Sequence, residues 1–184
     1  MTAIYIVSGL AAVLVLWGII VFNSLVRNTN RVREGWSGID VQLKRRSSLI
    51  PNLIKAVKGY MTHERELLAE VTALRSRAET TRAPGKKGKI EGQISGLLGN
   101  LFAMAENYPD LKADDGFRDL QRQLGEIETQ IQQARRDYNG STRKLNIVIE
   151  SFPSKVVANM FKFVQAEFFE NDDPADRAVP EVAF

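Results

Sequence analysis

The 184-residue chain contains no cysteine and a single histidine, His63. Without cysteine it can form no disulfide, no thiolate metal site, no catalytic thiol and no lipid anchor on an acylated cysteine. One histidine cannot build a histidine-based zinc site by itself. We therefore expect no metal and no cofactor.

Catalytic motifs are equally scarce. His63-Glu64 in MTHERELL is half of a helical zinc motif, but no second histidine follows four residues later. The stretch GKKGKIEGQISGLLGN lacks the spacing of a phosphate-binding loop, and no strand precedes it. Paired acids such as Asp114-Asp115 suit helix capping better than acid–base catalysis. No face interleaves basic and aromatic residues, so no nucleic-acid partner is expected. We predict that the chain is not an enzyme and has no catalytic residues.

A long apolar run is the strongest positive signal. Ile4 to Phe22 reads IYIVSGLAAVLVLWGIIVF and carries no charge. As a helix it is roughly 28 Å long, close to the hydrocarbon thickness of a bilayer. Tyr5 and Trp17 stand toward its ends, as interfacial aromatic residues do. A cleaved signal peptide fits poorly, because no basic residue precedes the run and no small-x-small cleavage site follows. We predict a retained membrane anchor; a buried core helix is the alternative.

Charge on the two sides of this run predicts an orientation. Six basic residues and two acidic ones lie between positions 27 and 46. The positive-inside rule then places the rest of the chain in the cytoplasm and the N-terminus outside. The residues close enough to meet lipid headgroups are Arg27, Arg31 and Arg33. Lys44 lies about 30 Å of helix beyond the run, too far for that role if the helix stands upright.

An apolar stripe with steps of three and four continues past Pro51 without a slip. Such a stripe is typical of a coiled-coil-type helix seam. Because a break usually resets the phase, we predict one long helix from Trp36 to Ala78, bent at Pro51, where the missing amide leaves the Ser47 carbonyl without a partner. The alternative is two helices on one axis, capped by Ser47 or Ser48. The stripe comprises Trp36, Ile39, Leu43, Arg46, Ile50, Leu53, Val57, Tyr60, Glu64, Leu67, Val71, Leu74 and Ala78.

Two members of the stripe are charged, Arg46 and Glu64. A buried charge needs a partner. We predict that Arg46 contacts an acid on a neighbouring helix and fixes the register of the helices.

Three further segments complete a helical architecture. The basic stretch Thr80–Lys89 is predicted to be a loop, followed by a helix over residues 90–105 and a connector, Glu106–Phe117. A second long seam runs from Phe117 to Phe152, and its phase persists across Asn139-Gly140. A short fourth helix is predicted to follow Pro153. Its apolar face is Val156, Val157, Met160, Phe161 and Val164.

These elements predict an all-α fold, an N-terminal transmembrane helix running into a long, proline-kinked helix of an antiparallel up-and-down four-helix bundle. The tail from residue 169 is acidic and contains proline, and is predicted to be disordered. The expected domains are a membrane anchor at 1–24, with its span at about 4–22, a helical bundle at 25–168 and the tail at 169–184.

Several motifs carry a family resemblance: WSGIDVQLKRRSSLIPNLIKAVKGYMTHE, ENYPDLKADDGF, ARRDYNGSTRKLNIVIESFPS and the late FF. They resemble the LemA family of bacterial inner-membrane proteins over nearly the whole chain. The resemblance implies one N-terminal transmembrane helix, a cytoplasmic four-helix bundle and no established enzymatic activity, with one relative taking part in organelle membrane formation. The motif residues are Trp36, Asp40, Arg46, Pro51, Glu64, Tyr108, Pro109, Asp110, Tyr138, Phe152 and Pro153.

Two classes of function remain. The first is a non-enzymatic, membrane-anchored scaffold or adaptor at the inner membrane, which recruits proteins or assembles with copies of itself and helps to organise the membrane. The second is a regulatory subunit of a membrane-bound protease or envelope-stress system. An enzyme of unknown type is a distant third. The expected partners are the lipid bilayer, through the N-terminal helix, proteins of unidentified kind, and further copies of the chain.

Overall fold

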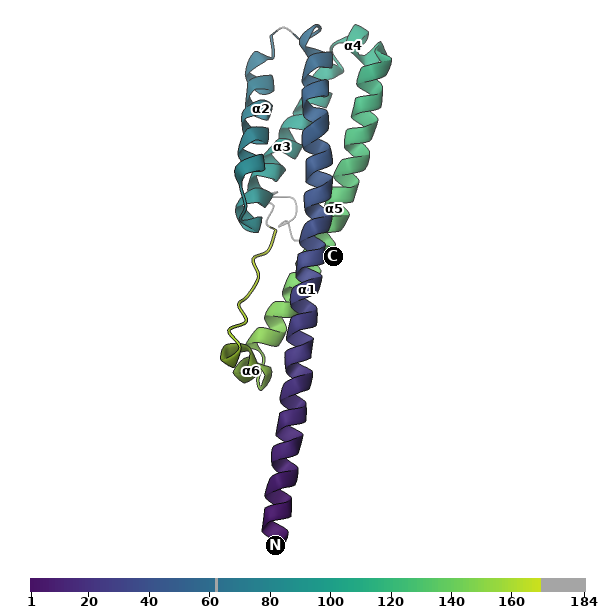
Figure 1. Cartoon of the computed structure of the whole chain (residues 1–184). Coiled ribbons are helices and arrows are strands. Elements are labelled where there is room, and N and C mark those ends of the chain that lie inside the picture. The colour runs from purple at the N-terminus through teal and green to yellow at the C-terminus, as the bar shows by residue number, and fades with distance from the viewer. Residues whose placement is uncertain (62, 170–184) are drawn as a thin grey trace, which may run out of the picture. The chain divides into compact units, whose positions relative to one another are not determined.

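The computed structural model describes residues 1–61 and 63–169, and every regular element within them is an α-helix (Figure 1). This confirms the predicted all-α class. The predicted acidic tail, residues 169–184, lies outside the described residues except for Phe169. The helices are α1 (Thr2–Lys58), α2 (Arg65–Thr80), α3 (Pro84–Ala105), α4 (Pro109–Ala113), α5 (Asp115–Glu150) and α6 (Ser154–Met160).

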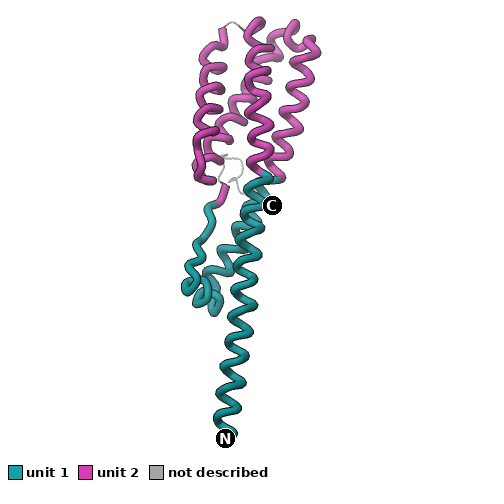
Figure 2. The backbone as a smooth tube through the Cα atoms, viewed as in Figure 1, with its two compact units in different colours: residues 1–38, 134–167 teal, residues 39–133, 168–184 magenta. Residues whose placement is uncertain are grey.

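The chain folds into two compact units that share two helices (Figure 2). Unit 1 consists of Met1–Gly38 and Ala134–Glu167, and therefore contains the start of α1, the end of α5 and all of α6. Unit 2 consists of Ile39–Gln133 together with, among the described residues near the C-terminus, Phe168 and Phe169. It contains the end of α1, the start of α5, and α2, α3 and α4 between them.

Unit 2 is an antiparallel bundle built from the end of α1, α2, α3 and the start of α5. Ser47 of α1 bonds to Glu79 near the end of α2, so these two helices run in opposite directions. Tyr108, just past α3, bonds to Glu64, just before α2, so α2 and α3 are also antiparallel. The core is a cluster of buried apolar side chains that includes Leu53, and all four helices contribute members to it.

Unit 1 packs the first part of α1 against α5 and α6. Gly35 of α1 approaches α5 so closely that an added Cβ would lie 3.0 Å from the Cα of Tyr138. The ring of Trp36 lies beside that of Tyr138, with centroids 5.6 Å apart. Leu25, in the part of α1 that belongs to this unit, is completely buried. Close backbone approach at a glycine thus joins α1 to α5.

Helix α1 passes through Pro51, as the unbroken stripe predicts, but it ends at Lys58 and does not continue to Ala78. The predicted single helix is therefore wrong beyond Lys58, because the chain reverses before α2. Val71 and Ala78 are buried as expected, although on a separate helix. In an antiparallel pair, each helix buries its own apolar stripe. If the connection between them has a suitable length, the three-and-four spacing of the second stripe continues that of the first in the sequence. Periodicity alone therefore cannot reveal the direction of the chain.

This reversal changes which helices form the bundle. The predicted first helix supplies two of its four members, and the predicted short fourth helix, α6, belongs to unit 1 instead. Helix α3 also begins earlier than expected, at Pro84, so most of the predicted basic loop is helical. Proline is well suited to the first turn of a helix, where its missing amide leaves no bond unmade.

Helix α5 agrees with the predicted second long seam. It continues without interruption through Asn139-Gly140. Asp114 caps its start, because the Asp114 carboxylate accepts a hydrogen bond of 2.7 Å from the Phe117 amide.

The predicted apolar face of α6 is only partly buried. Val157 is buried, whereas Val156, Met160, Phe161 and Val164 are exposed within the part of the chain that the structure describes. The prediction assumed that every apolar residue at helical spacing packs into a core. Helix α6 ends at Met160, so Phe161 and Val164 lie beyond it, and its buried side is formed by Val157 and Ala158.

Candidate functional site

The apolar N-terminal segment of α1 contains no buried residue, and most of its side chains are exposed. The most apolar 18-residue window of this helix is 0% buried within the described structure, and the helix is long and apolar enough to cross a membrane. A core helix of a water-soluble protein would bury such side chains. Arg27, Arg31 and Arg33 follow the apolar run and are all exposed. The arrangement places a basic collar directly beyond a candidate membrane span.

Arg46 is the centre of a buried polar cluster in unit 2. Its side chain is 1% exposed, and one guanidinium nitrogen lies 2.5 Å from Glu91 Oε2 and 3.0 Å from the Glu91 carbonyl oxygen. The other donates to Glu128 Oε2 at 2.7 Å and to Ser95 Oγ at 2.5 Å. Ser95 Oγ in turn lies 3.0 Å from Glu128 Oε2. The predicted contact between Arg46 and an acid on a neighbouring helix is confirmed, and the cluster ties α1 to both α3 and α5.

This cluster has a structural consequence more than a chemical one. The guanidinium directs its donors to two carboxylates and a hydroxyl, so its hydrogen-bonding capacity is used within the protein. Breaking such a buried pair is costly, because the remaining charge is left without a partner. The cluster can therefore favour one alignment of three helices, which is the role that the stripe position of Arg46 predicts.

A second polar junction lies at Pro51. Proline has no amide to bond the Ser47 carbonyl, and that oxygen instead accepts a hydrogen bond of 2.9 Å from Arg75 Nε of α2. Arg75 Nε also lies 3.0 Å from Ser47 Oγ, and Ser47 Oγ donates to Glu79 at 2.8 Å. Arg75 and Glu79 form an ion pair at 2.9 Å. The Ser47 carbonyl, which has no amide partner because residue 51 is proline, thus forms a hydrogen bond that links α1 to α2.

Asp40 links α1 to α3. Its carboxylate pairs with Lys44 at 2.7 Å and with Lys87 of α3 at 3.1 Å. The hydrogen bond from Lys44, together with Lys87, lowers the pKa of Asp40 below its usual range, against the opposing effect of partial burial. Lys87 can reach Asp40 because α3 begins at Pro84 and includes it.

Glu64, just before α2, is bonded to Tyr108, just before α4. The Tyr108 hydroxyl donates to Glu64 Oε1 at 2.6 Å, and this bond raises the pKa of Tyr108. Among the described residues, the other carboxylate oxygen, Oε2, is buried and has no hydrogen-bond partner. Pro109 and Asp110 form the exposed first turn of α4 immediately after Tyr108. Glu64 therefore lies in a connection rather than in a helix seam.

The remaining motif residues lie in unit 1. Tyr138 is buried, its hydroxyl donates to the Glu167 carbonyl at 2.7 Å, and burial raises its pKa. Phe152 is exposed, and Pro153 precedes α6. The sequence-predicted residues therefore do not converge on one site. They occupy separate places: the Arg46 cluster, the Pro51 junction, the Asp40–Lys87 pair, the Glu64–Tyr108 contact with the first turn of α4, the Trp36–Tyr138 pair, and the turn before α6.

Sequence reasoning did not identify the partners of Arg46 and Pro51. A signal for two of them exists: Glu91 stands in a three-and-four series with Ser95 and Leu98, and Glu128 lies between Leu124 and Ile131 at the same steps. Arg75 has no comparable signal, because its role follows from the reversal of the chain. In the part of the chain that the structure describes, no group of three or more histidine, cysteine or acidic residues could hold a metal ion.

The LemA family model matches residues 35–184, most of the chain. The chain belongs to the LemA family.

Named relatives of this LemA-family chain include magnetosome proteins. Magnetosome protein MamQ 1 and MamQ 2 of Paramagnetospirillum magneticum are each 25% identical to it, covering 86% of this chain and 68% of theirs. Protein LemA of Metamycoplasma hominis is 26% identical, covering 80% of this chain and 68% of its own. Family membership and these relatives support a membrane-associated helical protein of a non-enzymatic kind.

Proposed function

We propose that this LemA-family chain is a membrane-anchored scaffold or adaptor of the bacterial inner membrane, with no catalysis of its own. The observation that carries the proposal is the apolar segment of α1, whose most apolar window is 0% buried within the described structure. The Arg46 cluster and the Pro51 junction support it, because the polar groups described there bond to one another and hold helices in place.

The relatives favour a role in organising membranes. MamQ is named as a magnetosome protein in both Paramagnetospirillum magneticum and Magnetospirillum gryphiswaldense. By analogy, this chain acts on a membrane by self-assembly or by recruiting other proteins to it. We place the N-terminus outside and the helical units in the cytoplasm, on the basis of the charge after the span. The proposal includes three domains: a membrane anchor at 1–24, a helical region at 25–168 and a tail at 169–184.

Crosslinking in living cells tests the scaffold role. A photo-reactive residue placed at exposed Val41 should trap either further copies of this chain at discrete sizes or the same partner repeatedly. The control carries the reactive residue at buried Leu53, which faces the core and should trap nothing outside the chain. Size analysis in detergent then separates the two modes, since discrete oligomers indicate self-assembly and a monomer indicates an adaptor. A monomer with no adduct at Val41, nor at other exposed positions around unit 2, would contradict the scaffold role.

A further inference from the structure

Exposed apolar side chains form a face on one side of α6 and in the segments just before and after it, in unit 1. They are the largest concentration of exposed apolar side chains outside the N-terminal segment in the described chain. Phe152 is 87% exposed, Met160 70% and Val164 79%. Val156 and Met160 are four residues apart on α6 and therefore point to one side of that helix, and Phe152 lies in the turn just before it. The opposite side of α6 is buried through Val157 and Ala158.

This face lies beside the end of the apolar run. The ring of Phe22, the last residue of that run, contacts the ring of Phe161 with centroids 4.8 Å apart and that of Phe163 at 5.8 Å. If α1 spans a bilayer from Ile4 to Phe22, these three rings lie at the boundary between lipid tails and headgroups.

The length of α5 gives the same position independently. Its Tyr138 lies beside Trp36 of α1. From Tyr138 to the end of α5 is roughly 18 Å of helix, and from Trp36 back to Phe22 is roughly 21 Å along the antiparallel helix. The end of α5 at Glu150, two residues before Phe152, therefore reaches about the level of Phe22.

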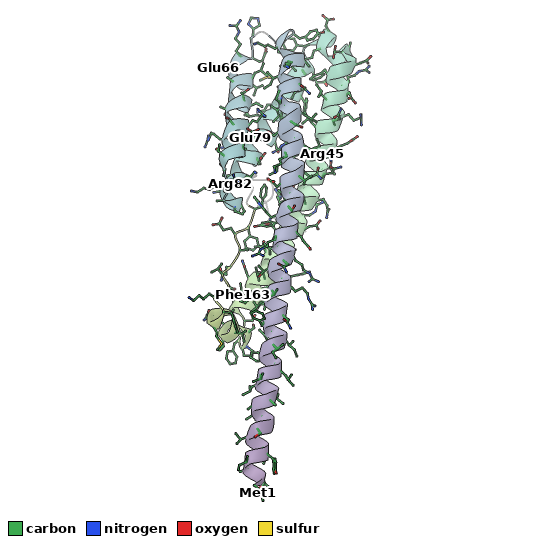
Figure 3. The ribbon with its side chains drawn as sticks, viewed as in Figure 1. Met1, Arg45, Glu66, Glu79, Arg82 and Phe163 are labelled. Atoms are coloured by element: carbon green, nitrogen blue, oxygen red, sulfur yellow. The ribbon has the colours of Figure 1, made fainter. Side chains whose placement is uncertain are left out.

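The turn after α6 holds the aromatic residues in place. The Phe163 amide bonds to the Ala158 carbonyl at 2.9 Å, and the Lys162 amide bonds to the Asn159 carbonyl at 3.2 Å. This is a Schellman motif with Lys162 in the left-handed conformation at φ 57°, a position that usually belongs to glycine. The turn brings the rings of both Phe161 and Phe163 against Phe22 of α1, and Phe163 is labelled in Figure 3.

Charge around the face suits an anionic membrane surface. Lys155 and Lys162 are exposed beside it, and Arg27 and Arg31 are exposed on α1 just beyond the apolar run. Of the nearby acids, Glu150 accepts a hydrogen bond from Gln165. Basic side chains flanking an apolar face are typical of helices that lie in the membrane interface.

We propose that the apolar face formed by Phe152, Val156, Met160, Phe161 and Val164 inserts into the interfacial layer of the same bilayer that α1 spans. The inference rests on the proposed membrane anchor. It gives the chain a second lipid contact beside its span, and this contact fixes how unit 1 stands on the membrane surface. The occupant is lipid, because the face is continuous with the span through Phe22.

Spin labels test this placement in the full chain, since the absence of native cysteine allows each label a unique position. Single cysteines replace Met160 on the apolar face, Leu14 in the membrane span, and the exposed Met104 of α3. The protein is reconstituted in vesicles containing anionic phospholipid. We expect labels at 14 and 160 to collide more with oxygen than with a water-soluble nickel chelate, and the label at 104 to show the reverse. Phe152→Cys provides a second reporter if Met160→Cys reduces helix content.

The three positions separate failure of this inference from failure of the anchor. A label at 160 that behaves like the one at 104, while the label at 14 is in lipid, overturns the inference alone. A label at 14 that is in water overturns the anchor and the inference together. Spin–spin broadening at 160 that disappears on dilution with unlabelled protein, in a label open to nickel, would assign the face to a second copy of the chain and overturn the lipid contact.

Discussion

Gly35 and Gly38 lie one turn apart on α1 and differ in what a side chain would meet. A Cβ at Gly35 would lie 3.0 Å from the backbone of Tyr138, whereas a Cβ at Gly38 would meet nothing within 4 Å. We expect Gly35→Ala to lower stability by about 1–3 kcal/mol through overpacking. Gly38→Ala should raise it by about 0.5–1 kcal/mol through helix propensity. Thermal unfolding followed by circular dichroism checks the pair, and equal effects would contradict the close approach at Gly35.

Neighbouring arginines on α1 provide a second matched comparison. Arg46→Glu would place a third carboxylate beside Glu91 and Glu128, and should cost at least roughly 3–5 kcal/mol, as loss of a buried ion pair does. Arg45→Glu makes the same charge change at an exposed position that bonds to Gln42 and Gln130, and should shift stability by about 0.5 kcal/mol or less. Urea unfolding in detergent measures both. An unchanged transition for Arg46→Glu would remove the cluster from the account of the fold.

The sequence predicted the surroundings of Arg46 correctly and those of Glu64 incorrectly. The stripe position of Arg46 predicted a buried charge with an acidic partner, because burial and charge together require one. The same argument placed Glu64 in a seam, yet it lies in a connection and bonds to Tyr108. Both residues occupy positions of the apolar stripe. The stripe predicts which side chains face the core, but it does not show whether a residue belongs to a helix or to a connection.

At the scale of helices, the Pro51 junction makes a testable claim about α1 and α2. Arg75→Ala removes a bond to the Ser47 carbonyl that exists because Pro51 has no amide. In a Pro51→Ala background the new amide can bond that carbonyl, so Arg75→Ala should cost less there. We expect a coupling of about 0.5–3 kcal/mol in a double-mutant cycle measured by chemical unfolding. Glu66→Ala, on the exposed first turn of α2, serves as the control, and it should show the same cost in both backgrounds.

The Asp40 pair between α1 and α3 should give a pH dependence. Its folded-state pKa is lowered below 3.8 by Lys44 and Lys87, so the pair stabilises the fold above that pH. The contribution is lost as the pH falls through the lowered pKa. Asp40→Asn should therefore reduce the melting temperature at pH 7, and the difference should vanish in strong acid.

Asp110→Asn is the control for that experiment, because it removes the same charge from an exposed position on α4. It should leave the melting temperature nearly unchanged across the pH range. A difference between wild type and Asp40→Asn that persists with the carboxyl fully protonated would show that the ion pair is not its source.

The periodicity of apolar residues predicted which segments are helical, but it did not predict where each helix ends. The stripe predicted α5 across Asn139-Gly140 and α1 across Pro51, because sustained phase outweighs one unfavourable residue. It missed the reversal after Lys58. The local signals there were Lys55 and Lys58 in the last turn with Gly59 just beyond, a pattern that favours a helix C-terminus.

At the scale of the whole molecule, the orientation in the membrane depends on the basic collar after the span. We expect a cysteine at position 2 to react with an impermeant maleimide in spheroplasts, and a cysteine replacing exposed Ser37 to remain unlabelled until the membrane is opened. Replacing Arg27, Arg31 and Arg33 by asparagine should weaken this preference and expose Ser37→Cys in part of the population. Labelling of Ser37→Cys in the unaltered background would reverse the proposed topology.

The joint at Pro51 also bears on how this chain can diverge. Its acceptor is a main-chain oxygen, which every amino acid at position 47 supplies, so the serine there can drift without abolishing the link. Positions 51 and 75 have no such freedom. In a lineage that exchanged the proline for a residue with an amide, the Ser47 carbonyl would be bonded from within α1, and Arg75 would be retained only for its contacts with Ser47 Oγ and Glu79.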